Sequence, residues 1–144
     1  MSLTFENAVD GLLGAFKTAW DTTGHTAYYE STVEDRQNDV SDPFDEDAFC
    51  QVWVNHFSGA QKTFGAPGGR RFSRVGELMV QIYCPAGKGL QESYALAKVL
   101  ADAFEGKSVV GGMWFRNTRI EEKRRDGNFR RLDFFTEFSY DEIK

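Results

Sequence analysis

The chain has 144 residues, of which 41% are hydrophobic and 15% are aromatic, and its formal net charge at pH 7 is -5. This composition excludes a disordered chain and predicts a single domain that buries roughly 70% of the surface exposed by the unfolded chain. No apolar run is long enough to span a membrane and the first residues lack a signal peptide, so we expect a protein that is made and kept in a cytoplasm.

Residues 4–20 are predicted to form the first helix. Phe5, Leu12 and Phe16 recur at helical spacing and define one apolar stripe. Thr4 is placed to cap the start of the helix with its hydroxyl group. Such a stripe is far more often packed against a protein core than against a membrane, and the polar side of this helix is not basic.

A short strand and an acidic loop follow the helix. Residues 26–33 alternate in the manner of a strand. Residues 34–47 are predicted to be a loop, because they contain Pro43, many acids and few apolar residues. Acidic side chains without a pattern are usually solvated, so we do not expect a catalytic carboxylate pair here.

The central feature is a predicted hairpin over residues 49–84. Both arms alternate with a period of two, and a glycine-rich loop, residues 58–70, joins them and projects beyond the core. We expect the arms to pair antiparallel about a centre near Pro67, in the register Val54–Val80, Val52–Ile82 and Cys50–Cys84. Projecting loops of this kind usually contact partners.

A second helix and a second hairpin complete the chain. Residues 90–104 carry the second apolar helical stripe, and Gly106 follows as a stop signal. Residues 113–123 and 129–140 are predicted strands, joined by a turn at Asp126-Gly127. The element order predicts an α+β fold: a single domain over the whole chain, with a largely antiparallel sheet, two helices packed on one face and long protruding hairpins.

No segment matches a catalytic, metal-binding or cofactor-binding motif. The glycines of residues 65–71 and 87–89 lack the spacing of a P-loop or a dinucleotide fingerprint. His56 is expected to be a structural histidine, and neither histidine completes a zinc pattern. Cys50 and Cys84 are expected to be buried thiols in a reducing compartment. We therefore expect no enzyme, no cofactor and no metal.

The charges are divided along the chain. Acids are concentrated between Glu30 and Asp47, whereas bases are concentrated between Arg116 and Arg131. The two groups are either solvated faces or complementary patches that meet between subunits. The basic group, with Phe129 inside it, suits a protein contact or a stacked single-stranded nucleic acid, and the net negative charge favours the protein contact.

Three stretches together resemble the tail terminator proteins of long-tailed bacteriophages and prophages: LTFENAVDGLLGAFKTAWD, FGAPGGRRFSRVGELMVQIYCPAGKGLQESYALAKVLADAFEGK and GGMWFRNTRIEEKRRDGNFRRLDFFTEFSYDE. The similarity covers nearly the whole chain except the acidic loop. Its most specific pieces are the glycine-rich loop followed by Arg70-Arg71-Phe72 and the strand start Trp114-Phe115-Arg116-Asn117. These motifs carry no chemistry, so the resemblance depends on their combination.

The resemblance implies a ring, usually of six subunits, that caps the finished tail tube, ends its polymerisation and offers the surface that docks onto the filled head. The implied partners are copies of the chain, the tail tube protein and a head-tail connector or stopper protein, with transient contact to passing DNA and no membrane. The implied location is the head-proximal end of the virion tail, after assembly in the host cytoplasm. It implies no enzyme and no cofactor.

Two sets of surface residues follow as candidates. We expect the subunit or tube interface at Phe64, Pro67, Arg70, Arg71, Asp42, Asp45 and Arg116. We expect a basic tip that faces the lumen or a partner at Lys123, Arg124, Arg125 and Arg130. Two alternatives stay open: another neck component, such as a tail-completion or head-closure protein, and a single-stranded nucleic-acid binder that uses Phe129 and the arginines.

Overall fold

The computed structural model describes residues 3–29, 48–85, 90–106, 112–124 and 129–144. The helices are α1 (Phe5–Trp20), the 3-10 turn η1 (Asp21–Thr23) and α2 (Leu90–Phe104). The strands are β1 (Thr26–Tyr29), β2 (Phe49–Gln61), β3 (Arg71–Pro85), β4 (Met113–Glu122) and β5 (Phe129–Ile143). Both predicted helices are therefore confirmed. The predicted loop at 34–47 and the turn at 126–127 lie outside the described residues.

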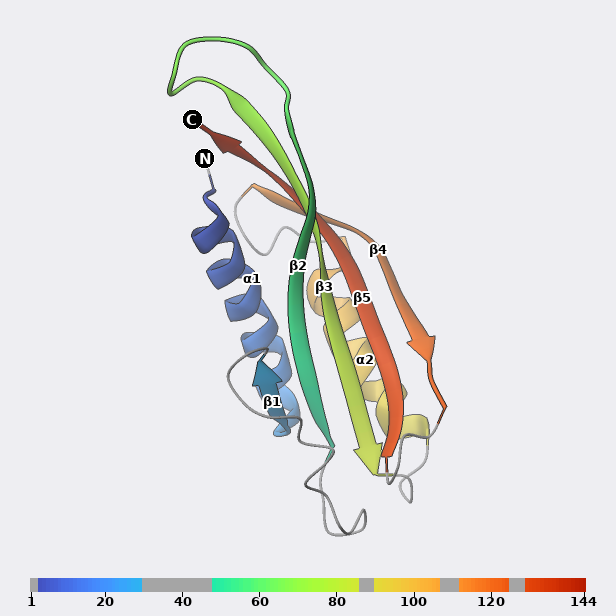
Figure 1. Cartoon of the computed structure of the whole chain (residues 1–144). Coiled ribbons are helices and arrows are strands. Elements are labelled where there is room, and N and C mark those ends of the chain that lie inside the picture. The colour runs from blue at the N-terminus through green and yellow to red at the C-terminus, as the bar shows by residue number, and fades with distance from the viewer. Residues whose placement is uncertain (1–2, 30–47, 86–89, 107–111, 125–128) are drawn as a thin grey trace.

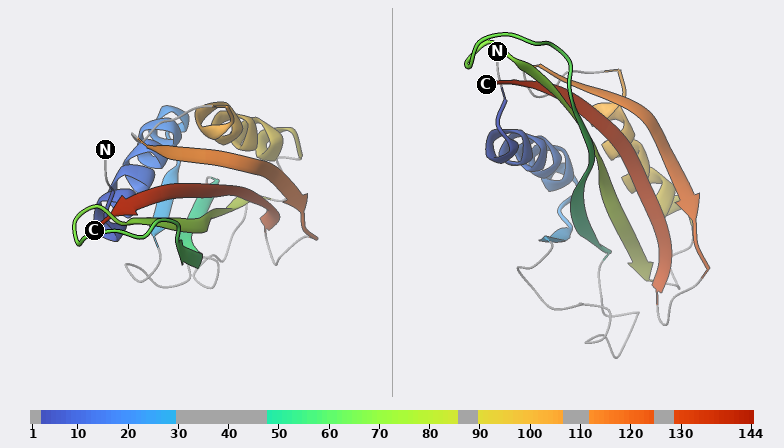
Figure 2. Two further views of the ribbon diagram at one scale, coloured as in Figure 1. Left: turned by 90° about the horizontal axis from the view of Figure 1, so that it is seen from above. Right: turned by 45° about the horizontal axis from the view of Figure 1, so that its top comes forward.

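The five strands form one sheet in the order β1-β2-β3-β5-β4. β1 pairs parallel to β2, and every other neighbouring pair is antiparallel. Both helices cover the same face of this sheet (Figures 1 and 2). The α+β prediction is confirmed, and the parallel placement of β1 is a feature that local alternation did not predict. Of the described helices, neither has the length and apolar character needed to cross a lipid bilayer.

The main core lies between the two helices and the covered face of the sheet. Phe16 and Leu12 from α1 and Leu100 and Phe104 from α2 are fully buried against the inward side chains of β3 and β5. Each such side chain contributes about 1.5–3 kcal/mol relative to an exposed one. Thr4 caps α1 as predicted, because its hydroxyl accepts a hydrogen bond of 3.2 Å from the Asn7 N–H.

A second, smaller cluster lies on the opposite face, which we call the open face. Phe49 stacks on Tyr83 with ring centroids 4.9 Å apart, and Phe129 meets Phe49 edge-on at 5.1 Å. All three side chains are buried. They extend the hydrophobic stabilisation to one end of the sheet that the helices do not cover.

The predicted register of the central hairpin is wrong by two residues. Cys50 pairs with Ile82, and the next pairs are Val52–Val80 and Val54–Leu78. A shift of two keeps every side chain on its predicted face, so apolar periodicity could not distinguish the two registers. Cys50 and Cys84 are buried free thiols, as expected, but they are not cross-strand partners.

The predicted loop is also too long, because the strands continue past a β-bulge. The register shifts between His56 and Ser58, which leaves Phe57 as the extra residue. The strands then pair as far as Gln61, and the loop is reduced to residues 62–70. The bulge turns Phe57 outward, where 54% of its surface is exposed.

Gly76 lies on β3 where β2 and β5 approach it closely. A Cβ atom at this position would lie 2.5 Å from the Asn55 backbone oxygen and 2.5 Å from the Phe138 ring. Gly14, on the exposed side of α1, has no such neighbour within 4 Å. One glycine is thus required by packing, whereas the other only weakens its helix.

We predict that Gly76→Ala lowers the free energy of unfolding by about 2 kcal/mol, because the sheet must move to admit the methyl group. The matched substitution Gly14→Ala is expected to raise it by roughly 0.5–1 kcal/mol. Urea denaturation followed by circular dichroism measures both. Equal effects of the two substitutions would contradict the packing described for Gly76.

Candidate functional site

The most prominent surface feature is the end of the β2–β3 hairpin, residues 58–75, which we call the hairpin tip. It projects beyond the N-terminal end of α1 (Figure 1). The strand β5 follows it outward, with pairing that continues to Arg71–Ile143. The backbones of Arg70 and Lys144 then exchange two hydrogen bonds, of 3.2 and 2.9 Å. The chain end thus supports the tip as a third strand.

The loop of the tip has its own hydrogen bonds. The N–H of Gly69 donates to the Ala66 oxygen at 3.1 Å, and Gly68 has a φ of 94°, which is the geometry of a type II turn with Pro67 at its second position. Arg70 Nε donates to the Gly65 oxygen at 3.0 Å. The loop therefore has a defined shape.

In this conformation of the loop, one aromatic side chain is almost fully exposed to solvent. Phe64 is 96% exposed, although a phenylalanine is among the most costly side chains to leave in water. An exposed aromatic side chain on an ordered projection is typical of a surface that contacts a partner.

The base of the tip is held by a partly buried ion pair. Arg74 Nη2 and Nε lie 3.1 and 3.3 Å from Glu142 Oε1, and the two side chains are only 14% and 10% exposed. The Arg74 guanidinium also lies 4.8 Å from the centroid of the Phe5 ring and 5.4 Å from that of Phe72. These contacts tie β3, β5 and the start of α1 together at the base of the tip.

His56 lies beside this ion pair and is structural, as expected. Its Nε2 is 2.7 Å from the Tyr140 hydroxyl, and its ring packs edge-on against Phe5 and Phe138. Burial, together with the charge of Arg74, lowers the pKa of His56. Burial and the charge of Glu142 raise the pKa of Tyr140 to about 12.

The tip is basic. Between Phe57 and Val75 the chain contains four basic residues and no acid: Lys62, Arg70, Arg71 and Arg74. Arg74 is neutralised by Glu142, and Arg71 lies 3.5 Å from Asp141. Among the contacts within the described ranges, the cationic groups of Lys62 and Arg70 have no acidic partner. The tip therefore presents two uncompensated positive charges beside Phe64.

The structure brings together four of the seven predicted interface residues. Phe64, Pro67, Arg70 and Arg71 all lie on the hairpin tip. Arg116 lies instead on β4, where its Nε is 4.0 Å from Glu137 Oε1. Asp42 and Asp45 lie outside the described residues.

The edge strand β4 contains a bulge that sequence analysis did not find. Arg116 pairs with Glu137 and Arg119 pairs with Phe135, so two residues of β4 oppose one of β5. Asn117 adopts a φ of 53° there, a conformation that asparagine tolerates better than most residues, and its amide donates to Glu137. In the sequence, the asparagine within this predicted strand is the feature that could have indicated a bulge.

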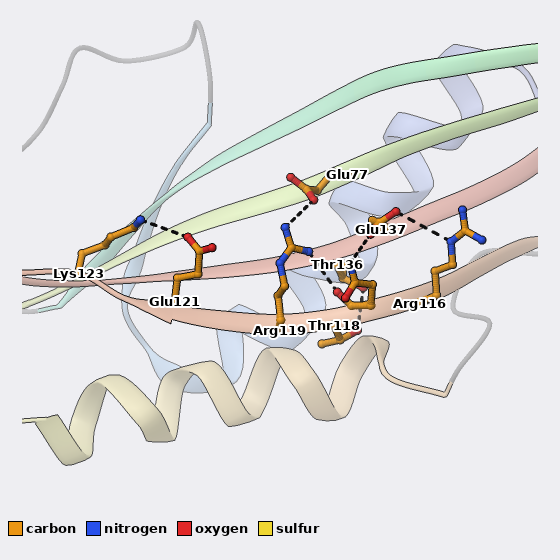
Figure 3. Close-up of polar contacts among 9 residues, drawn as sticks. Glu77, Arg116, Thr118, Arg119, Glu121, Lys123, Thr136 and Glu137 are labelled. Carbon is orange, nitrogen blue, oxygen red and sulfur yellow. Dashed lines mark hydrogen bonds and ion pairs between the residues drawn. The ribbon is translucent and has the colours of Figure 1, made fainter.

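The bulge exchanges the faces to which the following side chains point. Arg119 reaches the open face, where Nη2 lies 3.3 Å from Glu77 and the guanidinium lies 4.5 Å from the centroid of the Phe135 ring. Figure 3 shows this contact beside the Arg116–Glu137 pair. The open face near β4 is thus covered by charges that neutralise one another within the chain.

The predicted basic tip after β4 is only partly free. Lys123 and Arg130 are exposed, but Lys123 Nζ lies 3.2 Å from Glu121 (Figure 3). Arg124 is exposed, and Arg125 lies outside the described residues. The alternative in which Phe129 stacks on a base loses support, because this residue is only 1% exposed in the aromatic cluster of the open face.

A small apolar groove of about 290 Å³ lies between α2 and β4. Ala97 and Ala101 of α2 form one wall, and Ile120 and Phe134 form the other wall and the floor. The small alanine side chains keep α2 close to the sheet but leave its outer rim unfilled. The sequence pattern does not predict this groove, because Ile120 faces α2 only after the bulge.

The residues suited to chemistry are dispersed. No group of three or more His, Cys, Asp or Glu side chains that could hold a metal ion occurs in the described parts of the chain. Burial raises the pKa of the Cys50 thiol, which keeps it protonated and unreactive.

Comparison with known proteins gives a fold but no family. No family model matches the chain, and no curated protein matches it. Nineteen chains of solved structures do match. One of them, whose name states no function, is 16% identical with a TM-score of 0.58, over 91% of this chain and 94% of that one. At this identity the likeness shows the fold alone.

We predict that Glu142→Gln lowers the free energy of unfolding by about 2 kcal/mol, because it leaves the guanidinium of Arg74 partly buried without its carboxylate. The control is Asp102→Asn, which removes an exposed helical ion pair with Lys98 and is expected to change stability by less than the error of measurement. Chemical denaturation at pH 7 compares them. A neutral effect of Glu142→Gln would contradict a structural role for the pair.

We also predict that stability falls as the pH falls through the ordinary histidine pKa of 6.5. The pKa of His56 is lowered in the folded state, so the unfolded chain takes up the proton first, and the contribution is present above pH 6.5 and lost below it. Unfolding free energies measured between pH 7.5 and 5.5 test this. His56→Gln should remove the dependence; a dependence that survives this substitution would contradict its assignment to His56.

Proposed function

We propose that this chain is a structural virion protein of the tail-terminator type. Copies form a ring, six by the resemblance, that caps the tail tube, ends its polymerisation and provides the surface for joining to the head. The proposed partners are the tail tube protein on one side and a connector or stopper protein on the other. The proposed location is the head-proximal end of the tail, after assembly in the host cytoplasm.

One observation carries the proposal: the subunit has two unlike surfaces on different parts of the sheet. The hairpin tip is basic, bears the exposed Phe64 and projects from β2 and β3. The edge of β4 pairs with β5 on one side only, within the described residues. Unlike surfaces of this kind suit head-to-tail contacts, which close into rings when the rotation between copies allows it.

The sequence resemblance gives this arrangement its biological context. The glycine-rich loop with Arg70 and Arg71, which carries the resemblance, is the same segment that forms the tip. The exposed Lys123, Arg124 and Arg130 then face the lumen or a partner, where passing DNA would be contacted through its phosphates without base reading. The burial of Phe129 leaves the alternative of a base-stacking nucleic-acid binder without its aromatic residue.

Binding to tail tubes tests the proposed function. We expect the purified protein to co-sediment with tubes taken from the bacteriophage or prophage that encodes it, to lie at one tube end in electron micrographs, and to stop further addition of tube protein. Gly14→Ala, which changes only the exposed side of α1, should bind like the wild type. A protein that stays monomeric and never binds tubes contradicts the proposal, whereas a label elsewhere in the neck favours a completion or head-closure protein.

A further inference from the structure

The groove between α2 and β4 has a defined pattern of charge as well as shape. Its middle is apolar, with side chains of both walls and the floor: Ala97, Ala101, Thr118, Ile120 and Phe134. Ile120 is 37% exposed there. A cavity of about 290 Å³ is small for a cofactor or a drug-sized ligand but suits one large side chain.

A carboxylate lies near each end of the groove. At one end Tyr94 donates a hydrogen bond of 2.7 Å to Glu122, and this bond lowers the pKa of Glu122 and keeps it ionised. At the other end Glu105 contributes to the wall. Within the described residues neither carboxylate is paired with a basic side chain, whereas the neighbouring Lys98 is paired with Asp102. Arg119 also lines the groove, but it is paired with Glu77. Among the described residues, the charges at the groove that lack a partner are therefore the two carboxylates near its ends.

The hairpin tip has the complementary charges. Phe64 is 96% exposed, Lys62 precedes it by two residues, and Arg70 lies on the other arm of the loop. The bond from Arg70 to the Gly65 oxygen keeps that arginine close to the loop that carries Phe64. The tip thus presents a cation, an aromatic ring and a cation on an ordered support.

We propose that the hairpin tip of one copy of this chain binds in the α2–β4 groove of the next copy, with Phe64 between the walls and with Lys62 and Arg70 facing Glu105 and Glu122. The inference deepens the proposed function, on which it rests for the association of copies. It assigns the two surfaces of the head-to-tail contact. Burial of Phe64 removes the most exposed aromatic side chain among the described residues, and each of the two cations that lack an acidic partner there meets a carboxylate that lacks a basic one.

The tip cannot reach the groove of its own chain. β5 lies between the hairpin and β4 in the sheet, and the tip extends away from α2 (Figures 1 and 2). The two surfaces are also different, so the contact is heterologous and leaves a free tip on one copy and a free groove on the other. Repetition of such a contact produces a ring or a filament instead of a closed dimer.

Disulfide cross-linking between copies tests the contact. Phe64→Cys and Ile120→Cys are purified separately, mixed, oxidised and analysed on non-reducing gels, with and without tail tubes; the native thiols are buried and do not interfere. We expect a covalent dimer only in the mixture, and a ladder of multimers from the double variant. The control is Phe57→Cys, another exposed aromatic position of the same hairpin below the loop, which should not cross-link to Ile120→Cys.

Charge reversal provides a second readout that does not depend on disulfide geometry. Lys62→Glu should weaken self-association about 10-fold in sedimentation, and Glu105→Lys in the same chain should restore it. Gln61→Glu places the same charge next to Lys62 without removing the cation, and should weaken association less. Circular dichroism confirms that each variant is folded.

The outcomes separate this inference from the proposed function. Selective cross-linking together with charge rescue supports the tip–groove contact, even if the protein ignores tubes, in which case only the tail function fails. If cross-linking is absent or unselective and charge reversal is not rescued, the tip–groove contact is overturned. Rings of the wild-type protein on tail tubes would then show that the proposed tail function does not depend on this contact. Selective cross-linking without charge rescue overturns the assigned charge pairs. The binding of Phe64 in the α2–β4 groove is then retained.

Discussion

The ladder between β3 and β5 is the interaction on which the rest of the structure depends. It runs without a register break from Arg71–Ile143 to Pro85–Phe129. Because it is continuous, side chains of one parity form the floor of the main core and those of the other parity form the open face. The same ladder extends past the helices and becomes the support of the hairpin tip. One long antiparallel pair thus stabilises the core and holds the projecting surface in place.

The neighbouring strands β2 and β4 instead contain bulges. The bulge at Phe57 allows the hairpin to bend after His56, and the bulge at Asn117 brings Ile120 to the helix side and Arg119 to the open side. Without the second bulge Ile120 would point to the open side, and the groove would lose the aliphatic side chain of its wall. Bulges next to binding surfaces commonly redirect side chains in this way.

Charge compensation then distinguishes surfaces whose charges are paired within the chain from surfaces whose charges are not. Arg74, Arg119 and Arg131 each have a carboxylate partner in the same chain. Lys62 and Arg70 on the tip do not have one among the described residues, nor do Glu105 and Glu122 at the groove have a basic partner there. Paired charges interact within the chain. Unpaired charges beside exposed apolar groups are suited to binding another molecule.

Sequence alone determined both helices, the alternation of the strands, the α+β class and the projection of the glycine-rich loop, because each depends on local periodicity and turn chemistry. It grouped Phe64, Pro67, Arg70 and Arg71 for the same reason, but it also assigned Arg116 to that surface, whereas this residue lies on β4. Tertiary structure alone decided the register of Cys50, the burial of Phe129, the parallel pairing of β1 and the groove beside Ile120. A shift of two residues leaves periodicity unchanged, and a bulge or a distant aromatic partner leaves no local pattern, so only packing between remote segments could determine these features.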